Sequence, residues 1–350
     1  MDKNVSKKIS VYNYVFTLFI VIYHWKNFYE LIGVNSSSYT YLYNFFDMFG
    51  TIALAGFFAT SAYLLYFSAD NTADILKKMK RRLFSLFVPI LIWNTLAFIF
   101  QFVTAKLTES KFEISLMKIL LGYTFAMFDG PLWYLLAMIM LMCVAPLVIK
   151  LKNRKTLGTI VLVAVSAVSI ALSTLLNSDE SLIKGWFGRF FRYMPAYSLG
   201  VYFALNFKDI IANPKYKQKT LALIALPVLV LVSVYHILGI NNTVVYWLVL
   251  SLIPAVCWLA VPTFCFEKTK ITFRLKTSFF IYAMHNVFFI PIFNAFTIRF
   301  LAGRTITMPV ACLIHIALFA LLLAMVYVFA FVSKKILPKG IYNALSGGRG

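Results

Sequence analysis

Charged residues are scarce in this sequence, and acidic ones are the scarcest. Only 13% of the 350 residues are charged while 61% are hydrophobic, and 12 Asp and Glu stand against 33 Lys and Arg. A water-soluble domain of this length needs more polar surface than that, so most of the outside must face lipid. A net charge of +21 would suit a nucleic-acid partner. The basic residues, however, lie in short loops between apolar runs, which argues against a nucleic-acid partner.

Cysteine is also rare, and the motifs of common enzyme classes are missing. Cys143, Cys257, Cys265 and Cys312 lie in or at the edges of apolar runs and form no CxxC pair, so neither a disulfide framework nor a thiol metal site is indicated. There is no Walker loop, HExxH, GxSxG or dinucleotide-binding fingerprint. We therefore expect no metal and no bound cofactor. We find no internal repeat, which weighs against the inverted-repeat transporter designs.

What the sequence has in abundance is long apolar runs. A membrane-spanning helix needs about 20 mostly apolar residues, and in hydrocarbon such a run must be helical to satisfy its backbone polar groups. The sequence predicts an all-α integral membrane protein, a bundle of about ten transmembrane helices in a single domain over residues 1–350. The ten predicted spans are Tyr12–Glu30, Phe45–Phe67, Phe84–Val103, Leu132–Ile149, Leu157–Leu176, Phe187–Leu205, Leu221–Leu238, Val244–Phe266, Ser278–Phe296 and Pro309–Val332.

The basic residues are distributed unequally between the two sides of this predicted bundle. Ten spans place both termini on the same side, and 24 of the 33 Lys and Arg then fall on that side, against 9 on the other. By the positive-inside rule, both termini are predicted to be cytoplasmic. A misplaced span would invert every later loop and destroy this segregation.

Two histidines lie inside predicted spans, where a polar side chain costs about 2.5–3.5 kcal/mol on insertion scales. His24 lies in the outer half of the first span, and His285 lies near the middle of the ninth, three residues after Tyr282 on the same helix face. A histidine can act as a general base at neutral pH. Each can equally be a structural residue that is hydrogen-bonded to a neighbouring helix. His236 and His315 have no polar neighbours on their faces and are interpreted as structural.

Three arginines stand out among the basic residues. Arg82 ends a basic run at the start of the third span, where it can bind a phosphate or pyrophosphate or extend to lipid headgroups. Arg189 and Arg192 share a helix face in the outer third of the sixth span. Two like charges there would suit an anionic or glycan ligand, and headgroup contact is the alternative.

The order of these features resembles the acyltransferase-3 family, bacterial membrane proteins of ten helices that move acyl groups, usually acetyl, onto sugars and related acceptors. Each motif is short, but all occur in the family's order and at the expected helix. The matching segments are Phe19–His24, Phe57–Tyr63, Arg82 with Pro89 and Trp93, Leu132–Leu135, Pro195 with Tyr197–Gly200, and Ser278 with Tyr282 and His285.

The resemblance implies transfer of an acetyl or other short acyl group from cytoplasmic acyl-coenzyme A, with acetyl-coenzyme A as the expected donor, to a hydroxyl of an envelope glycan or lipid-linked sugar. It implies a bacterial inner or plasma membrane protein. His24 would be the catalytic base and Arg82 would hold coenzyme A phosphates. Tyr282 and His285 would line the central cavity, Trp133 and Tyr134 would meet a sugar at the outer face, and Ser61 would be a further substrate-binding residue.

The sequence also departs from the family pattern. The family's first-helix arginine, about eleven residues before the histidine, is replaced here by Asn13, and the second arginine of the third helix is replaced by Ser85. These departures leave room for a divergent donor, a changed acceptor or a catalytically inactive relative in envelope assembly. A transporter or flippase for a lipid-linked or small hydrophilic molecule is the other alternative.

Overall fold

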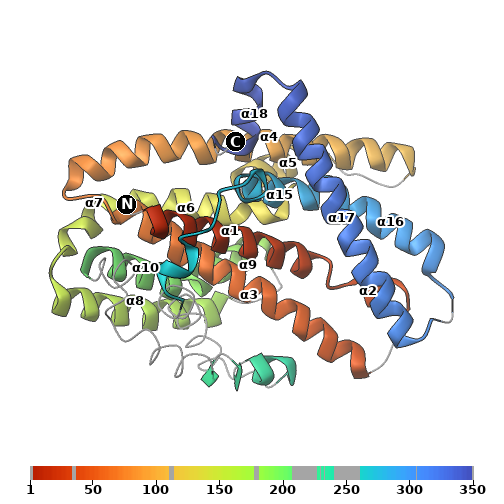
Figure 1. Cartoon of the computed structure of the whole chain (residues 1–350), viewed down its shortest axis with the longest axis horizontal. Helices are drawn as coiled ribbons and strands as arrows, with labels where there is room; N and C mark the ends of the chain where they lie inside the picture. Colours follow the sequence, from red (N-terminus) through yellow and green to blue (C-terminus); the bar gives the residue numbers. More distant parts are fainter. Residues whose placement is uncertain are drawn as a thin grey trace.

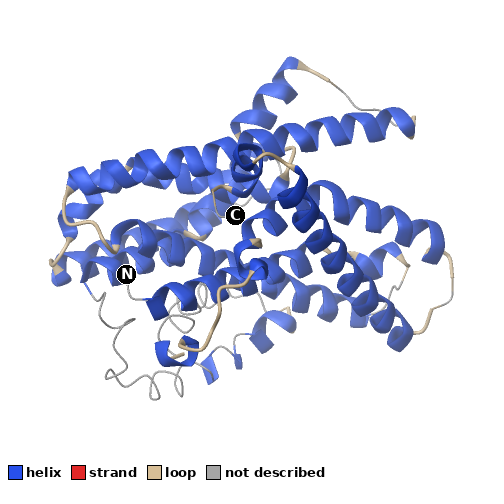
Figure 2. Cartoon of the chain, turned by 45° about the horizontal axis from the view of Figure 1, so that its top comes forward, coloured by secondary structure: helices blue, strands red, loops and turns tan. Residues whose placement is uncertain are grey.

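Every described element of the chain is a helix or a connecting loop (Figures 1 and 2). The computed structural model describes residues 3–33, 37–109, 114–176, 181–206, 227–228, 230–231, 233–239, 261–304 and 306–348. Its α-helices are α1 (Lys3–His24), α2 (Phe28–Leu31), α3 (Ser37–Tyr66), α4 (Thr72–Leu107), α5 (Leu116–Thr124), α6 (Trp133–Cys143), α7 (Ala145–Val148), α8 (Lys155–Leu176), α9 (Leu182–Arg192), α10 (Met194–Asn206), α14 (Phe273–Lys276), α15 (Ser278–Met284), α16 (Ile290–Leu301), α17 (Met308–Ile336) and α18 (Lys339–Ser346). Short 3-10 turns cover η1 (Gly130–Leu132), η2 (Ile149–Leu151) and η4 (Thr263–Phe266), and a π-helical turn covers η5 (His285–Phe289).

Within the described residues, six helical segments are long and apolar enough to cross a membrane. They coincide with the predicted first, second, third, fifth, ninth and tenth spans, and they are Lys3–Leu31, Thr40–Tyr66, Thr72–Leu107, Lys155–Leu176, Ser278–Leu301 and Met308–Ile336. A seventh candidate combines Gly130–Cys143 with Ala145–Leu151, which are bent by 51°. Pro146 follows this break and cannot donate a helical hydrogen bond. The chain is therefore an all-helical, multi-pass membrane protein with six or seven candidate spans in its described part.

The predicted sixth span, Phe187–Leu205, is not one continuous helix. The structure divides it between α9 and α10, with Tyr193 outside the helical conformation at the junction. Pro195, the second residue of α10, lacks the backbone N–H that a continuous helix would need. Of the predicted seventh span, residues 227–228, 230–231 and 233–238 are described, and they are helical up to residue 237. Of the predicted eighth, only residues 261–266 are described, and they end in the 3-10 turn η4.

The centre of the molecule is built from α1, α3 and α10, which lie side by side (Figure 1). A Cβ atom built on Gly200 of α10 would lie 2.2 Å from the carbonyl oxygen of Ala59 in α3. Only glycine allows the two helix backbones to approach this closely. The contact matters for the site because α3 carries Ser61 and α10 carries Tyr197.

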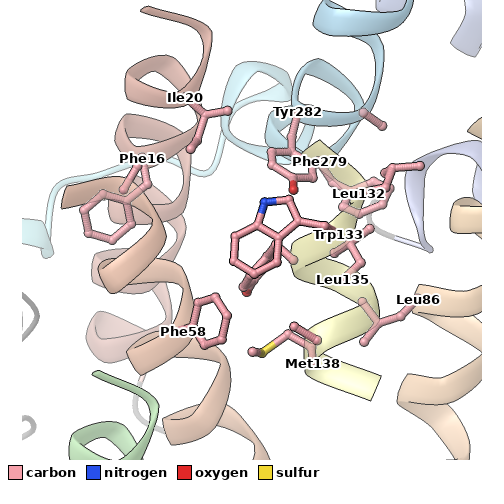
Figure 3. Close-up of a cluster of buried hydrophobic side chains, with 14 of the residues drawn as sticks. Phe16, Ile20, Phe58, Leu86, Leu132, Trp133, Leu135, Met138, Phe279 and Tyr282 are labelled. Carbon is pink, nitrogen blue, oxygen red and sulfur yellow. The ribbon is translucent and has the colours of Figure 1, made fainter. Parts of the chain in front are cut away.

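Aromatic side chains fill the space between these helices. Figure 3 shows Phe16 and Ile20 of α1, Phe58 of α3, Trp133 at the start of α6 and Tyr282 of α15 converging on one region. The ring centroids of Phe58 and Trp133 are 6.0 Å apart. Such ring contacts stabilise the fold beyond the contribution of burial alone, and they hold α1, α3, α6 and α15 in a defined arrangement.

Replacement of Gly200 by alanine should destabilise the fold. The added methyl group meets backbone rather than a movable side chain, and overpacking of this kind costs about 1–3 kcal/mol or more. We expect Gly200→Ala to lower the thermal unfolding midpoint of the detergent-purified protein by several degrees. Gly185→Ala on α9 is the control, because nothing lies within 4 Å of its Cβ position. Equal midpoints for the two variants would refute the close-approach argument.

Candidate active site

The larger of the two central cavities has a volume of about 440 Å³ and is named here the Arg82 cavity. Its walls come from α1, α3, α4, α6, α10 and α15, and they include Asn13, Ser61, Arg82, Tyr134 and Tyr282. Its volume falls within the range of about 300–1,000 Å³ that is typical of small-molecule sites. It can therefore enclose a substantial part of a cofactor-sized ligand.

Arg82 is fixed at this cavity by the backbone of α3. Its Nη1 donates to the carbonyl oxygen of Ser61 at 3.0 Å, and Lys276 also lines the cavity. Asn13 and Ser85, the positions that replace the two arginines of the family pattern, line the same cavity. The departures therefore change the polarity of this one cavity and leave Arg82 and Lys276 as its cations among the described lining residues.

Ser61 is engaged with a tyrosine rather than with a base. Its Oγ lies 2.6 Å from the hydroxyl of Tyr134, and Tyr134 donates its proton to the carbonyl oxygen of Phe57 at 3.1 Å. The Ser61 hydroxyl is then the donor to Tyr134. No histidine or carboxylate is among the described residues that line this cavity.

The second cavity contains His24 and is named here the His24 pocket. It has a volume of about 130 Å³, and its walls include Tyr23, His24, Trp133, Arg189, Arg192, Tyr193 and Tyr282. Trp133 and Tyr134, expected together at one face, are divided: Trp133 lines this pocket and Tyr134 lines the Arg82 cavity. The reason is helical geometry, because consecutive helix residues point about 100° apart.

The two cavities follow one another along α1. Residues from Ser6 to Thr17 line the Arg82 cavity, and Ile20, Tyr23 and His24 line the His24 pocket. Ser6 and His24 are separated by about 27 Å at a rise of 1.5 Å per residue, close to the hydrocarbon thickness of about 30 Å. Tyr282 lines both cavities, and its hydroxyl donates to the carbonyl oxygen of Pro131.

His285 lies apart from both cavity walls, contrary to the expectation that it lines the central cavity. It is 0% exposed and belongs to the π-helical turn that follows α15. Its Nδ1 lies 3.1 Å from the carbonyl oxygen of Ile281, so Nδ1 carries the proton and Nε2 carries a lone pair. The ring centroids of His24 and His285 are 5.2 Å apart. The structure thus brings the two predicted histidines together as neighbours.

Asp129 is a residue of this region that the sequence analysis missed. Its side chain is 0% exposed, and its backbone N–H donates to Oδ1 of Asn94 at 3.2 Å. Burial raises the pKa of the Asp129 carboxyl well above its usual value, and the Asn286 side-chain amide offsets this only in part. One feature of the sequence could have identified it: this acid lies two residues before Pro131, which directly precedes the Leu132–Leu135 motif.

The remaining described histidines have structural partners. His315 lies 3.2 Å from the hydroxyl of Tyr29 through Nδ1 and stacks on Phe28 with ring centroids 4.6 Å apart. Nε2 of His236 lies 3.4 Å from a carboxylate oxygen of Asp47. Among the described residues, no group of three or more His, Cys, Asp or Glu is arranged to hold a metal ion.

These observations define a multi-pass membrane protein whose helical bundle holds two cavities with Tyr282 in the lining of both. A sequence model of the acyltransferase 3 family, described as an acyltransferase domain, matches residues 14–334. Because this match covers most of the chain, the protein belongs to the acyltransferase 3 family and is an acyltransferase. No curated protein and no solved structure matches the chain.

The buried carboxyl of Asp129 should make stability depend on pH. Its pKa is higher in the folded than in the unfolded protein, so the folded state binds the extra proton and stability falls as pH rises above about 4, the ordinary aspartate value. We expect the thermal unfolding midpoint of the wild-type protein to fall between pH 5 and pH 8, and that of Asp129→Asn to fall less. Glu109→Gln, at an exposed position, is the control. An unchanged pH dependence in Asp129→Asn would contradict this assignment.

Proposed function

We propose that this acyltransferase transfers an acetyl or other short acyl group from acyl-coenzyme A on the cytoplasmic side to a hydroxyl of an envelope glycan or lipid-linked sugar. We further propose that it does so in a bacterial inner or plasma membrane with both termini cytoplasmic. The observation that carries the proposal is that Tyr282 lines both cavities. Donor and acceptor can then enter from opposite ends of α1 and meet beside one residue.

The Arg82 cavity is the proposed donor site. The Arg82 guanidinium and the Lys276 ammonium give this cavity positive charge at its predicted cytoplasmic end. Guanidinium groups bind phosphate oxygens through paired hydrogen bonds. Arg82 and Tyr282 both line this cavity, so we place the phosphates at Arg82 and the thioester at Tyr282. Coenzyme A acts here as a substrate and leaves after transfer.

His24 is the proposed catalytic base in the acceptor pocket. The acceptor hydroxyl loses its proton to His24 as its oxygen attacks the thioester carbonyl, the carbon–sulfur bond breaks, and the proton passes to the departing coenzyme A sulfur. His24 ends α1, where the carbonyl groups of the last helical turn stabilise a developing positive charge. Tyr282 lines both sites and shapes the place where acceptor and thioester meet, because its one hydroxyl proton is already donated to the carbonyl oxygen of Pro131.

His285 is proposed to orient His24. When His24 takes up the proton, both of its ring nitrogens carry hydrogen, and the second N–H needs an acceptor. Nε2 of the neighbouring His285 has that lone pair, because its Nδ1–H is committed to Ile281. His285 is therefore a positioning residue in this scheme.

Direct transfer is favoured over an acyl-enzyme. Ser61, a hydroxyl that lines the Arg82 cavity, donates its proton toward Tyr134, and a tyrosine hydroxyl does not act as a base at neutral pH. The transporter alternative predicts transport that does not require coenzyme A. The inactive-relative alternative predicts that loss of the His24 imidazole changes nothing.

Loss of His24 should abolish transfer. We expect membranes with the wild-type protein and labelled acetyl-coenzyme A to label an envelope glycan or lipid, and His24→Ala at equal expression to lower this by at least about 100-fold. His236→Gln is the matched control, because His236 lines neither cavity. Equal labelling by wild type and His24→Ala would show that His24 has no chemical role.

Loss of Arg82 should weaken donor binding. We expect Arg82→Gln to raise KM for acetyl-coenzyme A by about tenfold, because a charge-assisted hydrogen bond to phosphate is lost. Arg82→Lys should recover part of this effect by keeping the charge. Arg81→Gln is the control, since Arg81 is exposed on the same helix and does not line the cavity. A similar KM in all four proteins would remove Arg82 from the donor site.

A further inference from the structure

The His24 pocket has an unusual charge balance. Two of its described lining residues are arginines, and none of its described lining residues is acidic. Asp47 pairs with Lys26 at 2.5 Å, and Asp129 is buried outside the pocket wall. The described wall of this pocket therefore holds two guanidinium groups and no carboxylate.

Arg189 and Arg192 are held close together on the last turn of α9. They are three residues apart, which places them on one helix face, where like charges repel. A helix C-terminus favours cations, so the helix explains part of their presence. It does not explain why both arginines line a cavity with the proposed catalytic base.

The conformation of Arg189 leaves its two terminal guanidinium nitrogens available to a ligand. Its Nε donates to the carbonyl oxygen of Gly185 at 3.3 Å, and its guanidinium carbon lies 5.7 Å from the centroid of the Trp133 ring. No hydrogen bond of its two terminal nitrogens is described. A guanidinium anchored at Nε and supported by an aromatic ring presents those nitrogens to a planar or tetrahedral anion.

The size of the pocket limits what it can enclose. At about 130 Å³ it is smaller than the roughly 300 Å³ at which small-molecule sites usually begin. It therefore takes only the reacting part of an acceptor, so that a group bound by the arginines must lie close to the hydroxyl that faces His24. Trp133 and Tyr193 supply aromatic surface for a sugar ring in the same pocket.

We propose that the acceptor carries an anionic group, a phosphate or a carboxylate, next to the hydroxyl that is acylated, and that Arg189 and Arg192 bind this group. This inference rests on the proposed function for the identity of the pocket as the acceptor site. It adds the substrate class: an acidic or phosphorylated sugar rather than a neutral one.

Direct binding of simple sugars tests the inference without requiring turnover. The protein in a nonionic detergent is titrated with glucose 6-phosphate, glucuronic acid and glucose, and binding is followed by saturation-transfer NMR. We expect at least one charged sugar to bind about tenfold more tightly than glucose, and the better of the two identifies phosphate or carboxylate as the anion. The combined Arg189→Gln and Arg192→Gln variant should lose this preference, whereas Lys184→Gln, an exposed residue of α9, should keep it.

Two further measurements separate the possible failures. The thermal midpoint of the double variant shows whether it is folded, and the single Arg192→Lys variant, which keeps the charge, should retain the preference. An anion preference in a wild-type protein that transfers no acyl group would count against the proposed function alone. Equal binding of all three sugars, no binding of any, or stabilisation by phosphatidylglycerol in place of sugars would overturn the anionic-acceptor inference.

Discussion

The hydroxyl of Tyr282 donates to the carbonyl oxygen of Pro131, and this bond joins α15 to the turn before α6. Tyr282 lines both the Arg82 cavity and the His24 pocket, so the proposed reaction brings its two substrates together beside this residue. The bond also satisfies a backbone carbonyl inside the membrane region, where an unpaired polar group is costly. The same helix segment continues into the π-helical turn that places His285 beside His24.

The remaining architecture supports this meeting point. The close approach of α3 to α10 at Gly200 brings Ser61 and Tyr197 into one cavity wall, and the Trp133 ring supports Arg189 at the opposite end of the site. A membrane enzyme that joins a charged donor to a polar acceptor needs polar cavities inside an apolar body. Here each cavity gathers side chains from several helices, so that no single helix carries the full cost of its polar residues.

Much of the fold followed from the sequence because apolar length is a strong signal. Six predicted spans correspond to helical segments that can cross a membrane, and the resemblance in ordered motifs agrees with the family match. The break at Tyr193 was missed because hydropathy does not detect a helix junction. Eight of the nine candidate site residues line a cavity, and the ninth, His285, is a buried neighbour of His24. Asp129 was missed because its burial depends on contacts distant in sequence. The count of ten spans and the cytoplasmic termini remain predictions.

The most direct test of the central claim is a sidedness experiment in sealed vesicles of known protein orientation. Labelled acetyl-coenzyme A is supplied only on the side of the Arg82 cavity, and an acceptor sugar is supplied on one side at a time. Two cavities that follow one another along α1 and meet at Tyr282 predict that the label reaches acceptor on the opposite side of the membrane. Labelling only of acceptor on the same side as the donor would contradict the account.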